Sequence, residues 1–183
     1  MVEVSSRNII AGLSGYLIPP LLPIPILRLV PIISSTVSLQ WAVDEYQFLS
    51  SWQPHTYREQ ANELLPKWFR VWGSKSTLVL FSSFPWSAGA GLTNLFTLRN
   101  TPWVPGGAKV YYALGVGLAF GHMIFGPKAL GLLEKIRNGE PAGRPTETLA
   151  EWLKMHVFRT FVTDLPAVVC FLLAGVKACQ GEY

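Results

Sequence analysis

Charged residues are scarce in this sequence, and their scarcity excludes most soluble proteins. Only 14% of the 183 residues are charged, and 50% are hydrophobic. A typical soluble domain has about 25% charged residues. The net charge of +4 is scattered between apolar blocks, so the chain is not expected to bind nucleic acid. The length predicts one domain covering residues 1–183.

Cysteines and cofactor motifs are also few or missing. The sequence contains only Cys170 and Cys179, which excludes a disulfide framework and any CxxC metal or redox site. It has no Walker, GxGxxG, GxSxG or HExxH motif. No two of the three histidines stand four residues apart, so a metal site would need acidic residues from another helix. We therefore expect no cofactor and no bound metal.

Long apolar blocks are what the chain does contain. Blocks of about 20 residues are long enough to cross a hydrocarbon core of about 30 Å. None shows the sustained alternation of a barrel strand, so helices are the expected spanning structure. The sequence predicts an all-α, integral membrane four-helix bundle with spans at residues 9–33, 77–98, 110–130 and 153–176.

Proline crowds the first predicted span. Because proline lacks a backbone N–H and clashes with the preceding turn, the sequence predicts a proline-broken first helix. The broken backbone would either line the protein interior or form a kink at the membrane interface, with Arg28 reaching the headgroups. The prolines concerned are Pro19, Pro20, Pro23, Pro25 and Pro31.

The connection between the first two spans includes an amphipathic segment at residues 58–71. Basic residues such as Lys67 and Arg70 alternate there with aromatic ones such as Trp68, which is typical of a peripheral helix lying on a membrane surface. Basic residues are more numerous in the first and third connections. The positive-inside rule then places both connections in the cytoplasm and both termini across the membrane.

The fourth span carries a polar stripe. His156, Thr160 and Asp164 are spaced at i, i+4 and i+8, and Arg159 and Thr163 flank that line, so a regular helix presents all five on roughly one face. Ionisable residues within a membrane span are costly and usually face a protein interior or a wet cavity. This stripe is the first candidate for a functional site.

The residue types of this stripe indicate acid–base chemistry. We predict Asp164 as a catalytic carboxyl and Arg159 as the cation that orients it. His156, Asp44 or Glu45 would supply a second acid or base. The structural alternatives are that Asp164 and Arg159 only form an ion pair, and that His156 only lies at the membrane interface.

The predicted substrate contacts lie on three of the spans. His122 follows Gly121, which allows close approach of a neighbouring helix, so His122 would contact either the substrate or another helix. The full set of predicted substrate-binding residues is His122, Arg28, Thr160 and Tyr16.

Two short motifs resemble a known group of proteins. The pattern Trp152-(x3)-His156-(x2)-Arg159 and the stretch His122-Met-Ile-Phe-Gly-Pro127 resemble small four-span membrane proteins grouped with fungal anthrone oxygenases. The chain departs from that pattern because the entry to its second span has no histidine and its fourth span contains Asp164. The fourth span is more similar to the small membrane epoxide hydrolases of fungal polyene-pyrone pathways, of the aurovertin and citreoviridin type.

That resemblance implies a function that the spacing alone does not. It implies an epoxide hydrolase or cyclase of the endoplasmic reticulum membrane, which opens epoxides of a hydrophobic polyketide to diols or cyclic ethers without a cofactor. The implied partners are the polyketide substrate and the lipid bilayer. Whether the chain forms a homodimer is left open. The alternatives are a cofactor-free oxygenase of the anthrone type, or a non-catalytic membrane scaffold or transporter.

Overall fold

A computed structural model of the chain describes residues 22–181, apart from the side chains of residues 74–77, 80 and 81. Within these residues there are helices and turns but no strand, so the all-α prediction is confirmed for them. The helices are α2 (Ile24–Ser50), η1 (His55–Tyr57), α3 (Arg58–Thr97), α4 (Ala108–His122), η2 (Met123–Phe125), α5 (Gly126–Asn138), α6 (Pro145–Arg159), the π-helix η3 (Thr160–Asp164) and α7 (Leu165–Gln180).

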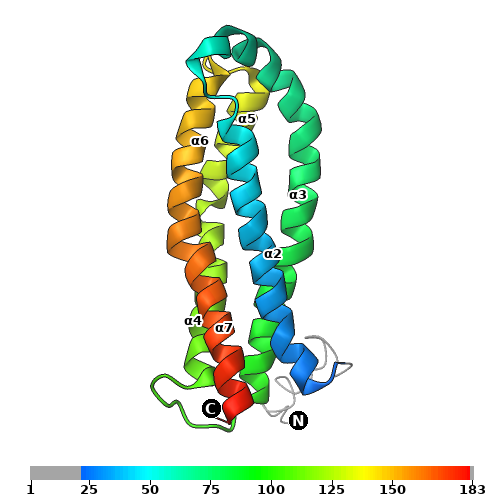
Figure 1. Ribbon diagram of the computed structural model, residues 1–183, viewed down its shortest axis with the longest axis vertical. Helices are drawn as coiled ribbons and strands as arrows, with labels where there is room; N and C mark the ends of the chain where they lie inside the picture. Colours follow the sequence, from blue (N-terminus) through cyan, green and yellow to red (C-terminus); the bar gives the residue numbers. More distant parts are fainter. Residues whose placement is uncertain (1–21, 182–183) are drawn as a thin grey trace, which may run out of the picture.

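These elements form four long rods packed side by side (Figure 1). Two rods are the single helices α2 and α3. The other two are composite, because α4 continues through η2 into α5 and α6 continues through η3 into α7. The start of α2, the loop 98–107 and the end of α7 lie at one end of the bundle, and the turns 51–57 and 139–144 lie at the other (Figure 1).

Among the residues that the structure describes, three helical runs are long and apolar enough to cross a membrane, namely Ile24–Ser50, Ala108–Asn138 and Pro145–Gln180. The last two runs include the predicted spans 110–130 and 153–176. The first run includes the end of the predicted span 9–33, and residues 9–21 of that span lie outside the described part. The predicted span 77–98 falls almost entirely within α3.

The prediction of a proline-broken first helix is wrong for the described residues. Pro23 stands at the N-cap of α2 and Pro25 in its first turn, where the missing N–H is tolerated. Pro31 lies inside the helix, and α2 continues through it to Ser50. Pro19 and Pro20 lie outside the described residues.

A side chain of α3 explains why α2 tolerates Pro31. The carbonyl of Leu27 would normally accept a hydrogen bond from the residue four positions on, which is Pro31 and has no N–H. Instead, Asn94 Nδ2 donates to Leu27 O at 2.9 Å and also to Ala90 O at 2.9 Å. Asn94 is 1% exposed, so a neighbouring helix satisfies the carbonyl within the bundle.

The predicted peripheral amphipathic helix is not a separate element. Residues 58–71 form the first part of α3, a helix of 40 residues. Leu65 and Phe69 have no exposed surface because they pack into the core between α2, α5 and α6. The amphipathic pattern therefore arises from burial against protein on one side of the helix.

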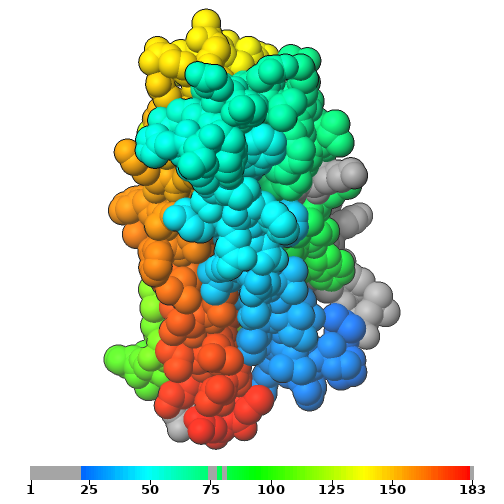
Figure 2. All heavy atoms as spheres, turned by 45° about the horizontal axis from the view of Figure 1, so that its top comes forward, coloured from blue at the N-terminus to red at the C-terminus, as the bar shows by residue number. Residues whose placement is uncertain are grey.

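The bundle contains two separate apolar clusters. The upper cluster lies toward the turns 51–57 and 139–144, whose side chains cover that end (Figure 2). The lower cluster lies toward the loop 98–107. The upper cluster comprises Leu49, Leu65, Phe69, Ala129, Leu132, Ile136, Leu149, Trp152, Leu153 and Met155; the lower comprises Leu98, Ala108, Tyr112, Val116, Ala167, Phe171, Ala174 and Ala178.

Candidate functional site

Two irregular stretches of backbone face each other between the upper and lower clusters. In the rod of α4 and α5, Pro127 has no N–H for the carbonyl of Met123. The N–H of Gly126 donates to that carbonyl instead, which tightens the backbone into the short 3₁₀ helix η2.

The rod of α6 and α7 is irregular at the same level. Pro166 cannot bond the carbonyl four residues before it, and the preceding turn widens into the π-helix η3. There the N–H of Leu165 donates to the carbonyl of Thr160, five residues back. Single π turns within α-helices frequently occur at functional sites.

His122 and Asp164 meet where these two stretches lie side by side. His122 Nδ1 is 2.7 Å from Asp164 Oδ1, and the two side chains are 13% and 12% exposed. The Thr163 hydroxyl is 2.7 Å from the carbonyl of Arg159 and 3.1 Å from Asp164 Oδ1. A hydroxyl carries one proton, so Thr163 donates to the closer acceptor, the carbonyl of Arg159. His122 is therefore the principal hydrogen-bond partner of Asp164 Oδ1.

Arg159 lies next to this pair and is 8% exposed. Its Nη2 is 2.8 Å from Nδ1 of His156, and its Nε is 3.8 Å from Oδ2 of Asp164. The second distance is an ion-pair contact but exceeds hydrogen-bonding range. The guanidinium therefore places a fixed positive charge beside the carboxylate.

His156 anchors the guanidinium to α2. It is 1% exposed, stacks on Trp152 with ring centroids 4.5 Å apart, and has Nε2 2.8 Å from the carbonyl of Ala42. Since a guanidinium only donates and a carbonyl only accepts, these bonds assign the proton to Nε2 and a lone pair to Nδ1. Both ring nitrogens are thus occupied in a neutral imidazole.

The adjacent acids of α2 point in different directions. Glu45 Oε2 lies 3.7 Å from His156 Nδ1, and the Glu45 side chain is 12% exposed. Asp44 accepts a hydrogen bond from Gln40 on its own helix at 2.9 Å. His122, Asp164, Arg159 and His156 form the polar cluster. The structure brings Glu45 to the edge of this cluster and leaves Asp44 away from it.

The remaining predicted residues are dispersed. The hydroxyl of Thr160, on η3, is buried without a hydrogen-bond partner in the described part of the chain. Arg28 Nη1 donates to the carbonyl of Ala178 at 3.0 Å. Ala178 is 14 residues beyond Asp164, or about 21 Å along α7, so Arg28 belongs to the end of the bundle. Tyr16 lies outside the described residues.

The partnership of His122 with Asp164 was missed at the level of sequence. The two residues are 42 positions apart, and His122 was predicted to contact the substrate or another helix. A weak signal was present, because each residue lies within five positions of a proline in an apolar span. The ring of Phe84 from α3 also lies beside His122, with centroids 6.0 Å apart.

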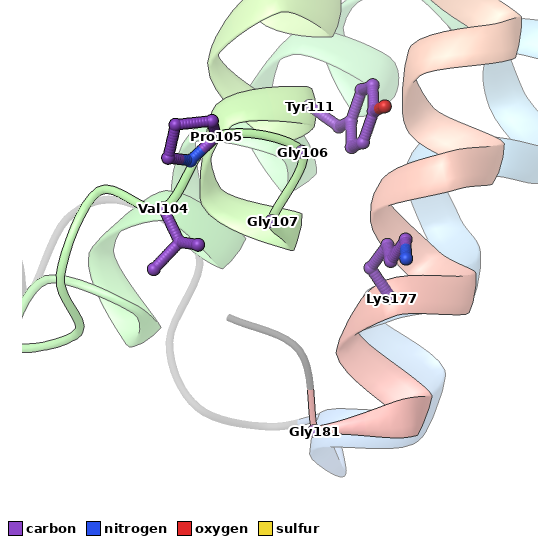
Figure 3. A pocket seen from close by; sticks show the side chains of 7 residues that line it. All are labelled: Val104, Pro105, Gly106, Gly107, Tyr111, Lys177 and Gly181. Atoms are coloured by element: carbon purple, nitrogen blue, oxygen red, sulfur yellow. The ribbon is translucent and has the colours of Figure 1, made fainter.

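An open hollow of about 490 Å³ lies at the lower end of the bundle, beside the start of α4. Figure 3 shows Tyr111 of α4 and Lys177 of α7 bordering it. Tyr111 is 11 residues before His122, or about 16 Å along the rod. The hollow is therefore separate from the polar cluster, and its described lining contains Tyr111 and Lys177 but neither a carboxylate nor a histidine.

The polar cluster can carry out proton transfer. It combines a carboxylate, a histidine within hydrogen-bonding distance of it, and a fixed guanidinium, all mostly shielded from solvent. Within the described residues, no three His, Cys, Asp or Glu side chains are grouped so that they could hold a metal ion.

Comparison with known proteins identifies several fungal relatives. The chain is 37% identical over 155 residues to "Probable epoxidase scpX" of Mollisia scopiformis, covering 85% of this chain and 97% of that protein. It is 36% identical over 157 residues to "Epoxidase pydX" of Acremonium sp, covering 86% and 96%. It is 35% identical over 153 residues to "Epoxidase gkaX" of Penicillium citrinum, covering 84% and 94%. No family model and no solved structure matches the chain.

Proposed function

The chain belongs to the same family as these fungal epoxidases, and from that premise we propose that it is a membrane-embedded tailoring enzyme handling an epoxide of a hydrophobic fungal metabolite. The observation that carries the proposal is the cluster of His122, Asp164 and Arg159 between the two apolar clusters of the bundle. In this proposal the bundle crosses the endoplasmic reticulum membrane, and a lipid-soluble polyketide reaches the cluster from the bilayer.

Epoxide formation is the first candidate reaction, because three relatives of similar length are named epoxidases. Adding one oxygen atom of O₂ to a carbon–carbon double bond releases the other as water and consumes two protons and two electrons. His122 and Asp164 are suited to deliver the protons. The electrons would come from a reductant or redox cofactor, which is then a further partner of this chain.

Epoxide opening to a diol or cyclic ether is the second candidate, and the geometry of the pair favours it. Asp164 would take the proton of the attacking water or hydroxyl as the new C–O bond forms. Protonated His122 would give a proton to the epoxide oxygen as its C–O bond breaks. His122 keeps its Nδ1 proton on the 2.7 Å contact with Asp164, so the proton taken up by Asp164 would return to Nε2 of His122 through water or the product hydroxyl, which restores the pair.

Oxygen isotopes distinguish the two reactions. The substrate to use is the intermediate that accumulates when this gene alone is deleted from the source organism. Membranes containing the protein would be given that intermediate under ¹⁸O₂ in ordinary water and, separately, under ¹⁶O₂ in H₂¹⁸O. Incorporation from ¹⁸O₂ supports epoxide formation. Incorporation from water, or an oxygen-independent isomerisation to a cyclic ether, supports opening.

Paired variants connect either outcome to the cluster. Asp164→Asn removes the carboxylate with little change in shape, and Glu151→Gln makes the same chemical change at an exposed position of α6, where Glu151 pairs with Lys128 at 3.0 Å. The proposal requires the first variant to lose turnover and the second to keep it. Full turnover by Asp164→Asn would contradict the proposed site, and a scaffold would be unaffected by either change.

A further inference from the structure

Arg159 has a buried hydrogen-bond donor that nothing in the described part of the chain satisfies. Its Nε–H has no hydrogen-bond partner among the described residues. The residue is only 8% exposed, so bulk solvent does not supply one. An unmet donor of a charged group is costly at such a position. The rest of the guanidinium is held in place, since Nη2 is bonded to His156, so Nε cannot turn to another partner without breaking that contact.

An acceptor lies opposite this donor, slightly too far away. Asp164 Oδ2 is 3.8 Å from Arg159 Nε, and no hydrogen bond from the described residues reaches it. The other oxygen, Oδ1, is already in contact with His122 and Thr163. The carboxylate thus has one occupied oxygen and one that remains open.

We infer that a hydroxyl group binds between Arg159 Nε and Asp164 Oδ2. An oxygen atom at about 2.8 Å from each of them forms a closed triangle on the 3.8 Å base. Such an atom must accept from Nε–H and donate to Oδ2, because a guanidinium only donates and a carboxylate only accepts. An ether, epoxide or carbonyl oxygen can accept but cannot donate, so the site selects an alcohol, an enol or water.

This inference deepens the proposed function and rests on it for the reaction. In epoxide opening, the bound hydroxyl is the nucleophile, and Oδ2 is the atom that takes its proton. In epoxide formation, the hydroxyl belongs to the substrate and fixes the position of a nearby double bond. The substrate class is thus a hydrophobic alkenol or epoxy alcohol, unless water supplies the hydroxyl.

Binding can be measured without turnover. The protein, labelled with [¹⁵N]arginine in lipid nanodiscs, would be titrated with (2E,4E)-hexa-2,4-dien-1-ol and with its methyl ether. The ether keeps the acceptor oxygen but loses the donor. The Nε–H signal of Arg159, assigned by its disappearance in Arg159→Lys, reports occupancy. We expect the alcohol to shift this signal saturably and to bind at least about tenfold more tightly than the ether.

Matched variants localise the effect. Asp164→Asn should remove most of the alcohol-over-ether preference, whereas Glu151→Gln should keep it. If water supplies the hydroxyl, the two ligands will bind alike, and a water cross-peak to the Arg159 Nε–H will be present. Equal binding without that cross-peak would overturn the inference.

The two proposals fail separately. An alcohol preference that depends on Asp164, in a protein that neither forms nor opens epoxides, would retain the hydroxyl site and reject the proposed function. Epoxide turnover in a protein with neither the preference nor the bound water would do the reverse.

Discussion

The upper and lower apolar clusters are packed by opposite means. The upper one is filled by large side chains, including Phe69 and Trp152, from four helices. The lower one combines several alanines with two large buried side chains, Tyr112 and Phe171. A Cβ on Gly91 or Gly115 would lie 2.8 Å from the Phe171 ring. Large side chains from four helices fill one half of the bundle, and in the other half glycines leave room for the ring of Phe171.

The polar cluster lies where these two kinds of packing meet. The helices on either side are regular, and the irregular turns η2 and η3 lie between the clusters. Each irregular turn precedes a proline, and His122 of one rod contacts Asp164 of the other at this level.

The largest expected effect concerns the junction itself. Asp164→Asn should reduce turnover of the native substrate by about 10²- to 10⁴-fold, the range of a lost acid–base group, with the thermal midpoint nearly unchanged. Product formation by mass spectrometry and thermal unfolding in nanodiscs measure the two quantities, with Glu151→Gln as the control. A parallel loss of stability and activity would indicate a structural role for Asp164.

The next effect tests the upper cluster. Phe69→Ala should destabilise the fold by about 3–5 kcal/mol, because it leaves a cavity among large side chains. Heating followed by size-exclusion chromatography measures the surviving folded fraction. Val71→Ala, at a position of the same helix that is 63% exposed, is the control and should change little. Equal losses would show that the upper cluster is not tightly packed.

A smaller effect tests the lower cluster by adding volume. Gly115→Ala should destabilise by about 1–3 kcal/mol through overpacking against Phe171. Gly117→Ala lies on the same helix, and its new Cβ would meet nothing within 4 Å, so it should be neutral or slightly stabilising. Phe171→Leu should partly rescue Gly115→Ala. Identical unfolding midpoints for the two alanine variants would contradict close packing here.

An effect of similar size tests the hydrogen bond that supports Pro31. Asn94→Leu should cost about 1–3 kcal/mol, since the Leu27 carbonyl loses its donor. In a Pro31→Ala background, the N–H of residue 31 can serve that carbonyl, so the same change should cost less. A double-mutant cycle on the unfolding midpoint measures the coupling. Purely additive losses would show that Asn94 acts elsewhere.

The sequence predicted the helical class, the end of α3 near residue 98 and the start of α4 near residue 110, because these depend on local pattern. The other predicted span ends within the described residues fall inside longer helices. The apolar block at 153–176 is visible in the sequence as a long run of mostly hydrophobic residues. The continuous path of α2 was not predictable in this way. It depends on Asn94, a residue 63 positions beyond Pro31 that appears in the sequence only as one amide in an apolar span.

The candidate site was predicted in part. Asp164, Arg159 and His156 were selected as polar residues on one helix face, and the structure brings them together. A regular helix would keep these residues in line, whereas the π turn at Thr160–Asp164 shifts them relative to one another. The contact with His122 depends on how two rods align along their length, and spacing within one segment cannot reveal that alignment.

The π turn also sets the direction in which the side chains of α7 point around the helix axis. Each residue of an α-helix turns the chain by about 100°, so deleting Val162, which would restore a regular turn, would rotate α7 by about that angle relative to α6. Phe171 would then point away from Gly91 and Gly115. The one additional residue that shapes the polar cluster is therefore also the residue that aligns the distant half of the bundle.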